Sequence, residues 1–504
     1  MEQILAAFST VLSPEFFVWL ILGVFLGLVV GAIPGINDVI AIAVLIPITF
    51  NLDPAQALLM LAGLYTAACY GGSFPAIMLR IPGTASSMVT VMDGYPMTLK
   101  GQGGLALGIS TISSIMGGLF SAVCLMFFAP TLAGYALYFG PAEYFSLGVL
   151  GLASVAGMAG KNAAKTLVAC LLGLLLSTVG MSPENGFPRF VGNYFELLDG
   201  IPFVAALIGL FGISSGFQLM ERLGQKTKMA DDDDVSRIRI GKTLPSFSLF
   251  RKLLPVIGTS SLLGTIIGIL PGAGQVMAIY MSYDLAKARN KDKEFGTGVP
   301  EGVAAPEAAN NAVVGGSMVP LLSLGVPGNG TSALFLGALM IHGLRPGPAL
   351  FADPSNIAYV IIVGFFLANF LLGPMGLFLG RMIAKFVFSI PDVLLGAAIV
   401  ILCVTGAFAA GNSTFYILVA LSFGLIGFIM EKLSIPLAPL ILALILGPMM
   451  ETGFTQSMTI SDHSLSIFVE QPISLCMLVV SLIFCLIPVV GAVRKRHNRY
   501  FDMG

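Results

Sequence analysis

The sequence is short of charged residues. Of its 504 residues only 10% are Asp, Glu, Lys or Arg, whereas 56% are hydrophobic. A soluble globular protein carries about 25% charged residues, so this chain has too few charged side chains to form a water-exposed surface. Its net charge of −1 also lacks the basic excess that nucleic acid attracts. We therefore expect neither a water-soluble domain nor a nucleic-acid partner.

The signatures of enzymes and ATP-driven pumps are also scarce. The chain has no H-E-x-x-H metal motif, no paired aspartates within its apolar runs and no phosphate-binding loop. All six cysteines lie in apolar runs, where they behave as small hydrophobes rather than as disulfide or metal ligands: residues 69, 124, 170, 403, 476 and 485. We predict that the protein is not an enzyme and needs no cofactor.

Apolar runs of 18 or more residues recur along the whole chain, which is the pattern of membrane-spanning helices. A membrane β-barrel would instead show segments of about ten residues with alternating polarity. The first apolar run lacks a basic segment before it and a small-residue cleavage site, so we expect it to be retained. The predicted fold class is an all-α polytopic membrane protein in a lipid bilayer.

The longest polar interval divides the chain near its middle. It runs from 221 to 252 and contains four aspartates at 231–234 among several lysines and arginines. An excess of Lys and Arg places a loop in the cytoplasm. We therefore predict a first transmembrane repeat at 1–220, a cytoplasmic linker at 221–252 and a second repeat at 253–504.

Short motifs of the first half recur in the second half in the same order. The matches are G-A-I-P-G (31–35) with G-I-L-P-G (268–272), Y-G-G-S (70–73) with V-G-G-S (314–317), R-I-P-G-T-A-S-S (80–87) with G-V-P-G-N-G-T-S (325–332), D-G-Y-P (93–96) with H-G-L-R-P (342–346), G-P-A-E (140–143) with I-P-D-V (390–393), and A-G-K-N (159–162) with A-G-N-S (410–413). Each match is weak alone, but their common order indicates an internal duplication.

Loop charges indicate that the two repeats are inverted. The basic cluster at 287–293 corresponds to the loop 51–56, which has no Lys or Arg, and Arg381 and Lys385 correspond to an uncharged segment near 131–135. Conversely, Lys161 and Lys165 of the first half correspond to the bare loop 411–414. Since positively charged loops stay in the cytoplasm, corresponding loops should lie on opposite sides. Inverted-topology repeats, with re-entrant or broken helices, are typical of secondary transporters. The basic C-terminal segment 494–499 should be cytoplasmic.

The segments P-G-T-A-S-S and P-G-N-G-T-S interrupt apolar runs at matched positions. Irregular backbone at membrane depth is tolerated only where it is buried in protein or lines a watery cavity. Helix starts offer free N–H groups and a positive dipole end to a carboxylate, and nearby hydroxyls can donate further bonds. The predicted substrate-binding residues are Gly83, Thr84, Ala85, Ser86, Ser87, Gly328, Asn329, Gly330, Thr331 and Ser332. The alternative is that these Pro-Gly pairs are packing kinks.

Unwound carbonyls near the glycine turns suit a hard cation such as Na⁺. The predicted ligands are carbonyls near Gly35 and Gly272, together with the amide oxygens of Asn310 and Asn311.

Several long motifs carry a family resemblance. In the second half these are P-E-G-V-A-A-P-E-A-A-N-N-A (300–312), L-G-V-P-G-N-G-T-S-A-L (324–334) and G-A-L-M-I-H-G-L-R-P-G-P (337–348). In the first half they are G-A-I-P-G (31–35), L-I-P-I-T-F (45–50), Y-G-G-S (70–73), I-P-G-T (81–84) and D-G-Y-P-M (93–97). The chain resembles, over essentially its whole length, the large membrane subunit of the tripartite tricarboxylate transporters, and looks most similar to citrate-type members.

The resemblance implies a multi-pass protein of the bacterial inner membrane. It implies a small membrane subunit and a periplasmic solute-binding protein as partners, a carboxylate such as citrate as substrate, and uptake driven by an ion gradient, with Na⁺ as the expected coupling ion. The alternatives are a transporter of another dicarboxylate or small organic anion or, in a different class, an ion channel.

Two departures from the family pattern add site candidates. The first Pro-Gly is followed by Ile36, Asn37 and Asp38 instead of a small glycine-rich step, so Asn37 and Asp38 are further cation candidates. Arg80 stands where the family commonly has an amide, and it either pairs with a substrate carboxylate or extends from a helix end toward water. Glu301 and Glu307 either complement a helix dipole or take part in binding a cation or partner.

Overall fold

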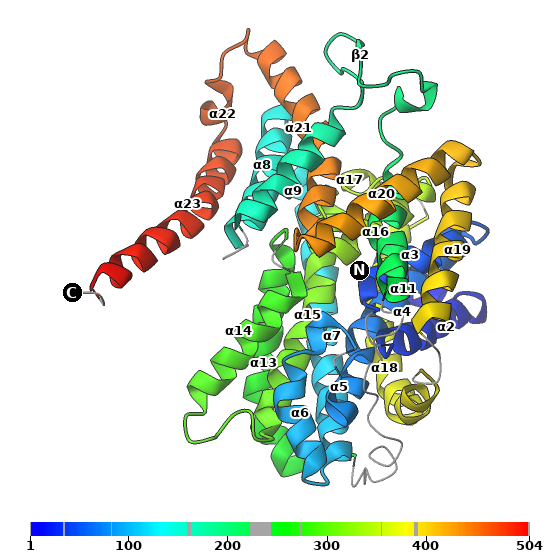
Figure 1. Cartoon of the computed structure of the whole chain (residues 1–504), viewed down its shortest axis with the longest axis vertical. Coiled ribbons are helices and arrows are strands. Elements are labelled where there is room, and N and C mark those ends of the chain that lie inside the picture. The colour runs from blue at the N-terminus through cyan, green and yellow to red at the C-terminus, as the bar shows by residue number, and fades with distance from the viewer. Residues whose placement is uncertain are drawn as a thin grey trace.

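The structure, a computed structural model, consists almost entirely of helices (Figure 1). It describes residues 2–33, 36–81, 83–158, 163–221, 243–272, 274–353, 355–387 and 392–501. In these ranges the only sheet is a hairpin of two short antiparallel strands, β1 (Gly180–Met181) and β2 (Pro188–Arg189). Most of the predicted linker and the predicted sites at Gly35 and Lys161 lie outside the described residues.

The first half contains the following elements. They are α1 (Glu2–Leu12), α2 (Pro14–Gly31), α3 (Asp38–Thr49), α4 (Pro54–Gly71), α5 (Ser73–Leu79), the 3₁₀ turn η1 (Ala85–Ser87), α6 (Thr90–Leu99), α7 (Gly103–Ala136), α8 (Pro141–Met158), α9 (Ala163–Ser177), the 3₁₀ turn η3 (Phe195–Leu197), α10 (Phe203–Leu207), the π-helical η4 (Ile208–Ile213) and α11 (Ser214–Glu221).

The second half continues after the linker. Its elements are α13 (Phe247–Ile269), α14 (Gly274–Arg289), α15 (Pro300–Leu324), α16 (Gly330–Ile341), α17 (Pro348–Ala352), α18 (Ile357–Val387), α19 (Asp392–Gly411), α20 (Thr414–Lys432), α21 (Leu437–Ile460), α22 (Ile467–Glu470) and α23 (Pro472–Phe501).

Within the described ranges, nine helical stretches are long and apolar enough to cross a membrane. In hydrocarbon every backbone N–H and C=O must be paired internally, which a helix achieves by itself. The prediction of an all-α polytopic membrane protein is therefore confirmed.

Helix pairs of the two halves pack through matched glycines. In the first half Gly31 of α2 lies directly against the carbonyl of Ala68 on α4. In the second half the corresponding Gly268 of α13 lies against the carbonyl of Val313 on α15. Glycine permits this close approach because a Cβ atom at either position would overlap the neighbouring backbone. The same packing thus occurs at matched positions of the two halves.

The two halves are nevertheless interleaved rather than separate. Helix α15 packs along α7, α18 packs on α4 and α7, and α19 packs on α3 and α11. The segments that follow the two Pro-Gly pairs each contact the other half. Helix α16 of the second half packs on α3 of the first, and η1 of the first half packs on α14 of the second. Consequently the polar start of each segment lies beside a helix of the other half.

A peripheral group of helices lies beside this core. Helix α8 packs on α21 and α23, and α9 packs on α21. Figure 1 shows α23 (red) extending away from the rest of the molecule beyond this group. The hairpin of β1 and β2 lies at the end of the molecule opposite α5 and α6.

Basic residues gather where the linker is attached. Lys432 pairs with Glu221 at 2.5 Å, at the linker's first end, and the Lys165 ammonium donates to the carbonyl of Leu433 at 2.5 Å. At the linker's other end, Gly108 of α7 lies against the carbonyl of Thr243. These contacts place Lys165, at the start of α9, close to the end of α20, which in turn contacts Glu221 at the start of the linker.

Candidate functional site

The start of α3 brings a buried acid, Asp38, against the second broken segment, which follows Pro327 and Gly328. Asn37 caps α3, because its Oδ1 accepts from the Ile40 N–H at 2.9 Å. Asp38 follows as the first helical residue and is 4% exposed. Its Oδ2 accepts from the Thr331 hydroxyl at 2.5 Å and from the Cys69 thiol at 3.8 Å. Asp38 and Thr331, predicted as cation and substrate ligands, are therefore in direct contact.

Helix α14 reaches the same point from the second half. Gln275 occupies the position that matches Asp38, and its amide donates to the Cys69 sulfur at 2.8 Å. The Cys69 carbonyl accepts from the Asn310 amide at 2.8 Å. Cys69 on α4 thus joins the starts of α3 and α14 to the middle of α15.

Two amide oxygens on α15 have no partner among the described residues. Asn310 and Asn311 are 1% and 0% exposed, and each uses its amide nitrogen on a carbonyl of α4, that of Cys69 or of Thr66. Their Oδ1 atoms make no hydrogen bond. A buried acceptor without a donor is costly, and a cation is one way to satisfy it. Both residues fit the predicted cation site on this ground.

The second broken segment is held by a reciprocal cap. The Oδ1 of Asn329 accepts from the Ser332 N–H at 2.8 Å, and the Ser332 hydroxyl accepts from the Asn329 N–H at 2.9 Å. The amide of Asn329 also donates to the Tyr65 hydroxyl at 2.8 Å, which lies 3.1 Å from the Ser317 hydroxyl. Asn329 therefore caps α16, the helix that follows the second Pro-Gly pair.

The first broken segment repeats part of this pattern within a shorter turn. The Thr84 N–H donates to the Ser87 hydroxyl at 3.2 Å, and that hydroxyl donates to the Thr84 carbonyl at 2.9 Å. Asn329 and Ser332 make the corresponding bonds in the second half. Thr84 and Ser86 hydroxyls also lie 2.7 Å apart. However, the residues from Ala85 form the 3₁₀ turn η1, so no long helix starts here.

The glycines of both segments are fixed by close backbone packing. An added Cβ at Gly83 would lie 2.7 Å from the Gly31 carbonyl oxygen, and one at Gly328 would lie 2.5 Å from the Gly268 carbonyl oxygen. Gly330 begins α16 and has ordinary space around it. The packing alternative therefore has a physical basis at Gly83 and Gly328, beside the polar cluster.

Gly272, at the end of the G-I-L-P-G motif, contacts the turn at Gly328. Its N–H donates to the Gly328 carbonyl at 2.7 Å, and its φ of +76° lies in the left-handed region that favours glycine. The structure therefore places Gly272 next to the second broken segment.

Arg80 makes no hydrogen bond to either segment among the described residues. It ends α5 in the left-handed conformation (φ 61°), as Gly325 ends α15 (φ 73°) at the matched position. Its side chain is exposed and lies over the Tyr95 ring, 5.9 Å from the centroid. This geometry favours the alternative in which Arg80 extends from a helix end.

Three residues of the cluster were missed by sequence reasoning. Cys69 and Tyr65 lie in an apolar run and are fully buried, and Cys69 was predicted to behave only as a small hydrophobe. Gln275 could have been found, because it occupies the position that corresponds to Asp38 in the duplicated sequence. Position in the repeat was therefore a signal that residue type alone did not provide.

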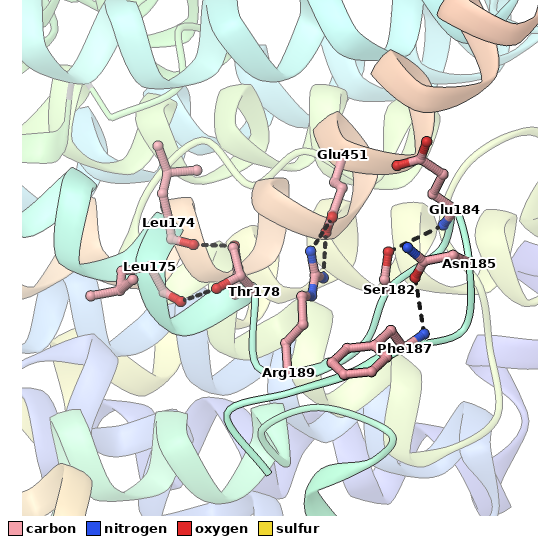
Figure 2. Close-up of polar contacts among 10 residues, drawn as sticks. Leu174, Leu175, Thr178, Ser182, Glu184, Asn185, Phe187, Arg189 and Glu451 are labelled. Carbon is pink, nitrogen blue, oxygen red and sulfur yellow. Dashed lines mark hydrogen bonds and ion pairs between the residues drawn. The ribbon is translucent and has the colours of Figure 1, made fainter.

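A second, shallower site lies on the loop that carries the hairpin. A cavity of about 530 Å³ is lined by this loop, by α21 and by the end of α16. Figure 2 shows Arg189 pointing to Glu451, with bonds of 2.5 Å and 3.0 Å from its two terminal nitrogens. The Glu451 carboxylate raises the pKa of Arg189 further above its usual value. Arg189 is already paired with both carboxylate oxygens of Glu451. It therefore attaches the loop to α21 and is not a free positive charge for a ligand.

One segment matches the G-x-S-x-G pattern of hydrolase nucleophiles but not its geometry. Gly212 to Gly216 reads G-I-S-S-G and lies within the helical turns of η4 and α11. The Ser214 hydroxyl donates to the Leu210 carbonyl one turn earlier. A nucleophile elbow requires a strand–turn–helix junction, so this serine is a helix-packing residue.

These features define a multi-pass α-helical membrane protein in which broken helices from both halves meet around buried polar side chains. Helix breaks at matched positions near the middle of a membrane protein are typical of transporter sites. The profile of the tripartite tricarboxylate transporter TctA family matches residues 17–442. The chain belongs to this family, a family of transporters rather than enzymes, whose members are parts of a tripartite system.

Two relatives come from Agrobacterium vitis. An uncharacterised 52.8 kDa protein of the TAR-I ttuC′ 3′ region is 37% identical over 495 residues, which cover 98% of this chain and 97% of the relative. An uncharacterised protein of the TAR-II ttuC′ 3′ region is 34% identical over 239 residues, which cover 47% of this chain and 98% of the relative. No solved structure matches.

Proposed function

We propose that the chain is the large membrane subunit of a Na⁺-coupled importer of a tricarboxylate such as citrate. It works in the bacterial inner membrane with a small membrane subunit and receives its substrate from a periplasmic solute-binding protein. The single observation that carries the proposal is the contact of Asp38 with Thr331, which joins the predicted cation and substrate segments. An ion and a substrate that share neighbouring residues can stabilise each other's binding, as coupled transport requires.

The residues have separable roles in this proposal. Helix α16 begins at Gly330, so its first N–H groups and the positive end of its dipole can hold a substrate carboxylate. Asp38 supplies a negative charge, and Asn310 supplies a buried amide oxygen that has no partner within the described ranges, both suited to Na⁺. Cation binding near Asp38 would remove the repulsion between this carboxylate and an arriving tricarboxylate.

The two halves are proposed to be inverted repeats. The motif order, the opposed loop charges and the matched contacts of Gly31 and Gly268 support a duplication, and the loop charges support the inversion. In a cysteine-free background, cysteines introduced at Lys165 and Lys287 should both react with an impermeant reagent added from the cytoplasm. A cysteine at Phe187 should react only from the periplasm, and labelling of Lys165 and Lys287 from opposite sides would contradict the topology.

Transport in proteoliposomes tests the function. Radiolabelled citrate should accumulate when the vesicles contain the complete transporter and an inward Na⁺ gradient. Asp38→Asn should reduce the Na⁺ dependence of uptake while the protein remains monodisperse. Equal uptake with a proton gradient and no Na⁺ would reject Na⁺ coupling, and accumulation of a dicarboxylate but not citrate would correct the substrate.

A further inference from the structure

Glu307, near the start of α15, lies in a pocket of hydroxyl groups. Its Oε1 accepts from Ser73 at 2.6 Å and from Thr90 at 2.5 Å. Its Oε2 accepts from Ser110 at 2.9 Å and from Ser114 at 3.0 Å. All five side chains are completely buried, and we refer to them as the Glu307 cluster. They come from α5, α6, α7 and α15, so the cluster joins elements of both halves.

Most other buried carboxylates of the described residues have an evident role. Asp93 accepts three backbone N–H bonds from 296, 298 and 299 and one from the Tyr283 hydroxyl. Glu143 caps α8 through the Gly140 N–H, and Glu301 pairs with Lys293. Apart from Asp38, Glu307 alone in this set has neither a backbone cap nor a basic partner among the described residues.

The position of Glu307 makes an uncompensated charge expensive. It stands seven residues into α15, beyond the first turn where the helix dipole would favour a carboxylate. Its four partners are neutral hydroxyls, and both of its oxygens act only as acceptors, which suits the ionised form. A charged side chain inside a membrane protein normally has a counter-charge or handles an ion.

The atoms of the cluster match the needs of a small hard cation. One carboxylate and four hydroxyls present only oxygen, and each hydroxyl keeps two lone pairs besides its proton. The single negative charge balances a monovalent rather than a divalent ion. We propose that the Glu307 cluster binds a second Na⁺ ion, separate from the one proposed near Asp38. The inference rests on the proposed Na⁺ coupling and extends it by one site.

The two cation sites would lie about one helical turn apart. Glu307 precedes Asn310 by three residues on α15, and Ser73 follows Cys69 by four residues at the end of the α4–α5 stretch. One helical turn rises about 5.4 Å, so the Asn310–Cys69 bond lies between the two carboxylates. Occupation of one site can therefore affect the other through α15 and α4.

Equilibrium binding of ²²Na⁺ to the purified full-length chain tests the proposal. Wild type should bind two Na⁺ ions. Glu307→Gln should lose one of them and keep the other, which is the ion that Asp38→Asn removes. Ser110→Ala and Ser114→Ala keep the carboxylate and should weaken Na⁺ binding by about three- to tenfold. Ser113→Ala is the matched control, because Ser113 is buried on the same helix but its hydroxyl has no hydrogen-bond partner among the described residues.

The outcomes separate this inference from the proposed function. If Glu307→Gln binds Na⁺ as wild type does, the second site is overturned and the Asp38 site stands. If Glu307→Gln does not fold, wild-type Na⁺ binding by the Ser110 and Ser114 variants leads to the same conclusion. A change only in the pH dependence of uptake, with unchanged Na⁺ stoichiometry, would assign a proton to Glu307 and also overturn it. If wild type binds no Na⁺ at all, the coupling proposal itself fails.

Discussion

Gly328 offers the most direct test of how the second broken segment is built. An added Cβ there would lie 2.5 Å from the Gly268 carbonyl oxygen and 2.9 Å from the Ser317 Cα. Both neighbours are backbone atoms, so they cannot rotate away as a side chain could. Gly328→Ala therefore requires the segment to shift, at a cost of about 1–3 kcal/mol, the range for overpacking a closely packed site.

The shift should affect transport more than stability. Asn329 and Thr331 follow Gly328 directly and make the bonds to Tyr65 and Asp38. A displacement of about 1 Å in a site can reduce a rate by about 100-fold. We expect Gly328→Ala to lose most citrate uptake in proteoliposomes while the purified protein still unfolds cooperatively, at a lower temperature.

Gly330→Ala is the matched control. Its added Cβ would lie 3.6 Å from the Phe211 ring, which is ordinary contact, and alanine favours a helix by up to about 1 kcal/mol over glycine. The unfolding temperature should therefore stay close to wild type, and uptake should fall less than in Gly328→Ala, because alanine keeps the N–H group at the start of α16. Wild-type transport by Gly328→Ala, or equal damage from both variants, would refute the reasoning.

Three further predictions concern single side chains. Thr331→Ala removes the hydroxyl bond to Asp38 and should weaken substrate or Na⁺ binding by about 0.5–3 kcal/mol, measured as a shift in half-saturation, whereas Thr331→Ser should not. Arg80→Gly should stabilise the protein by about 1 kcal/mol in thermal unfolding, because arginine is strained in the left-handed conformation. Transport should be retained, and its loss would restore a role for Arg80 in substrate binding. Arg189→Lys loses the paired bonds to Glu451 and should lower the free energy of unfolding by only about 0.2–1 kcal/mol, since both side chains are partly exposed. The citrate concentration for half-maximal uptake should not change, and a large increase in it would show that Arg189 contacts substrate.

The sequence by itself determined the class of protein and the location of its helix breaks. The scarcity of charge and the long apolar runs leave a helical membrane protein as the stable solution, because backbone groups in hydrocarbon must pair within the chain. Proline and glycine act locally, so the ends of α5 and α15 and the cap at Asn329 follow from neighbouring residues. The recurring motifs were visible for the same reason, since they are made of short local signals.

Only the tertiary structure decided which polar residues share a site. Asp38 and Thr331 are almost 300 positions apart, and Glu307 meets hydroxyls that lie about 190–230 positions earlier. No local pattern encodes such contacts; they arise because the halves interleave, with α16 on α3 and α15 on α7. Arg80 shows the opposite case: its charge suggested a ligand, but the helix end on which it stands turns it toward the surface. Residue type therefore indicates which side chains can bind an ion, and the packing of distant segments determines which of them lie together.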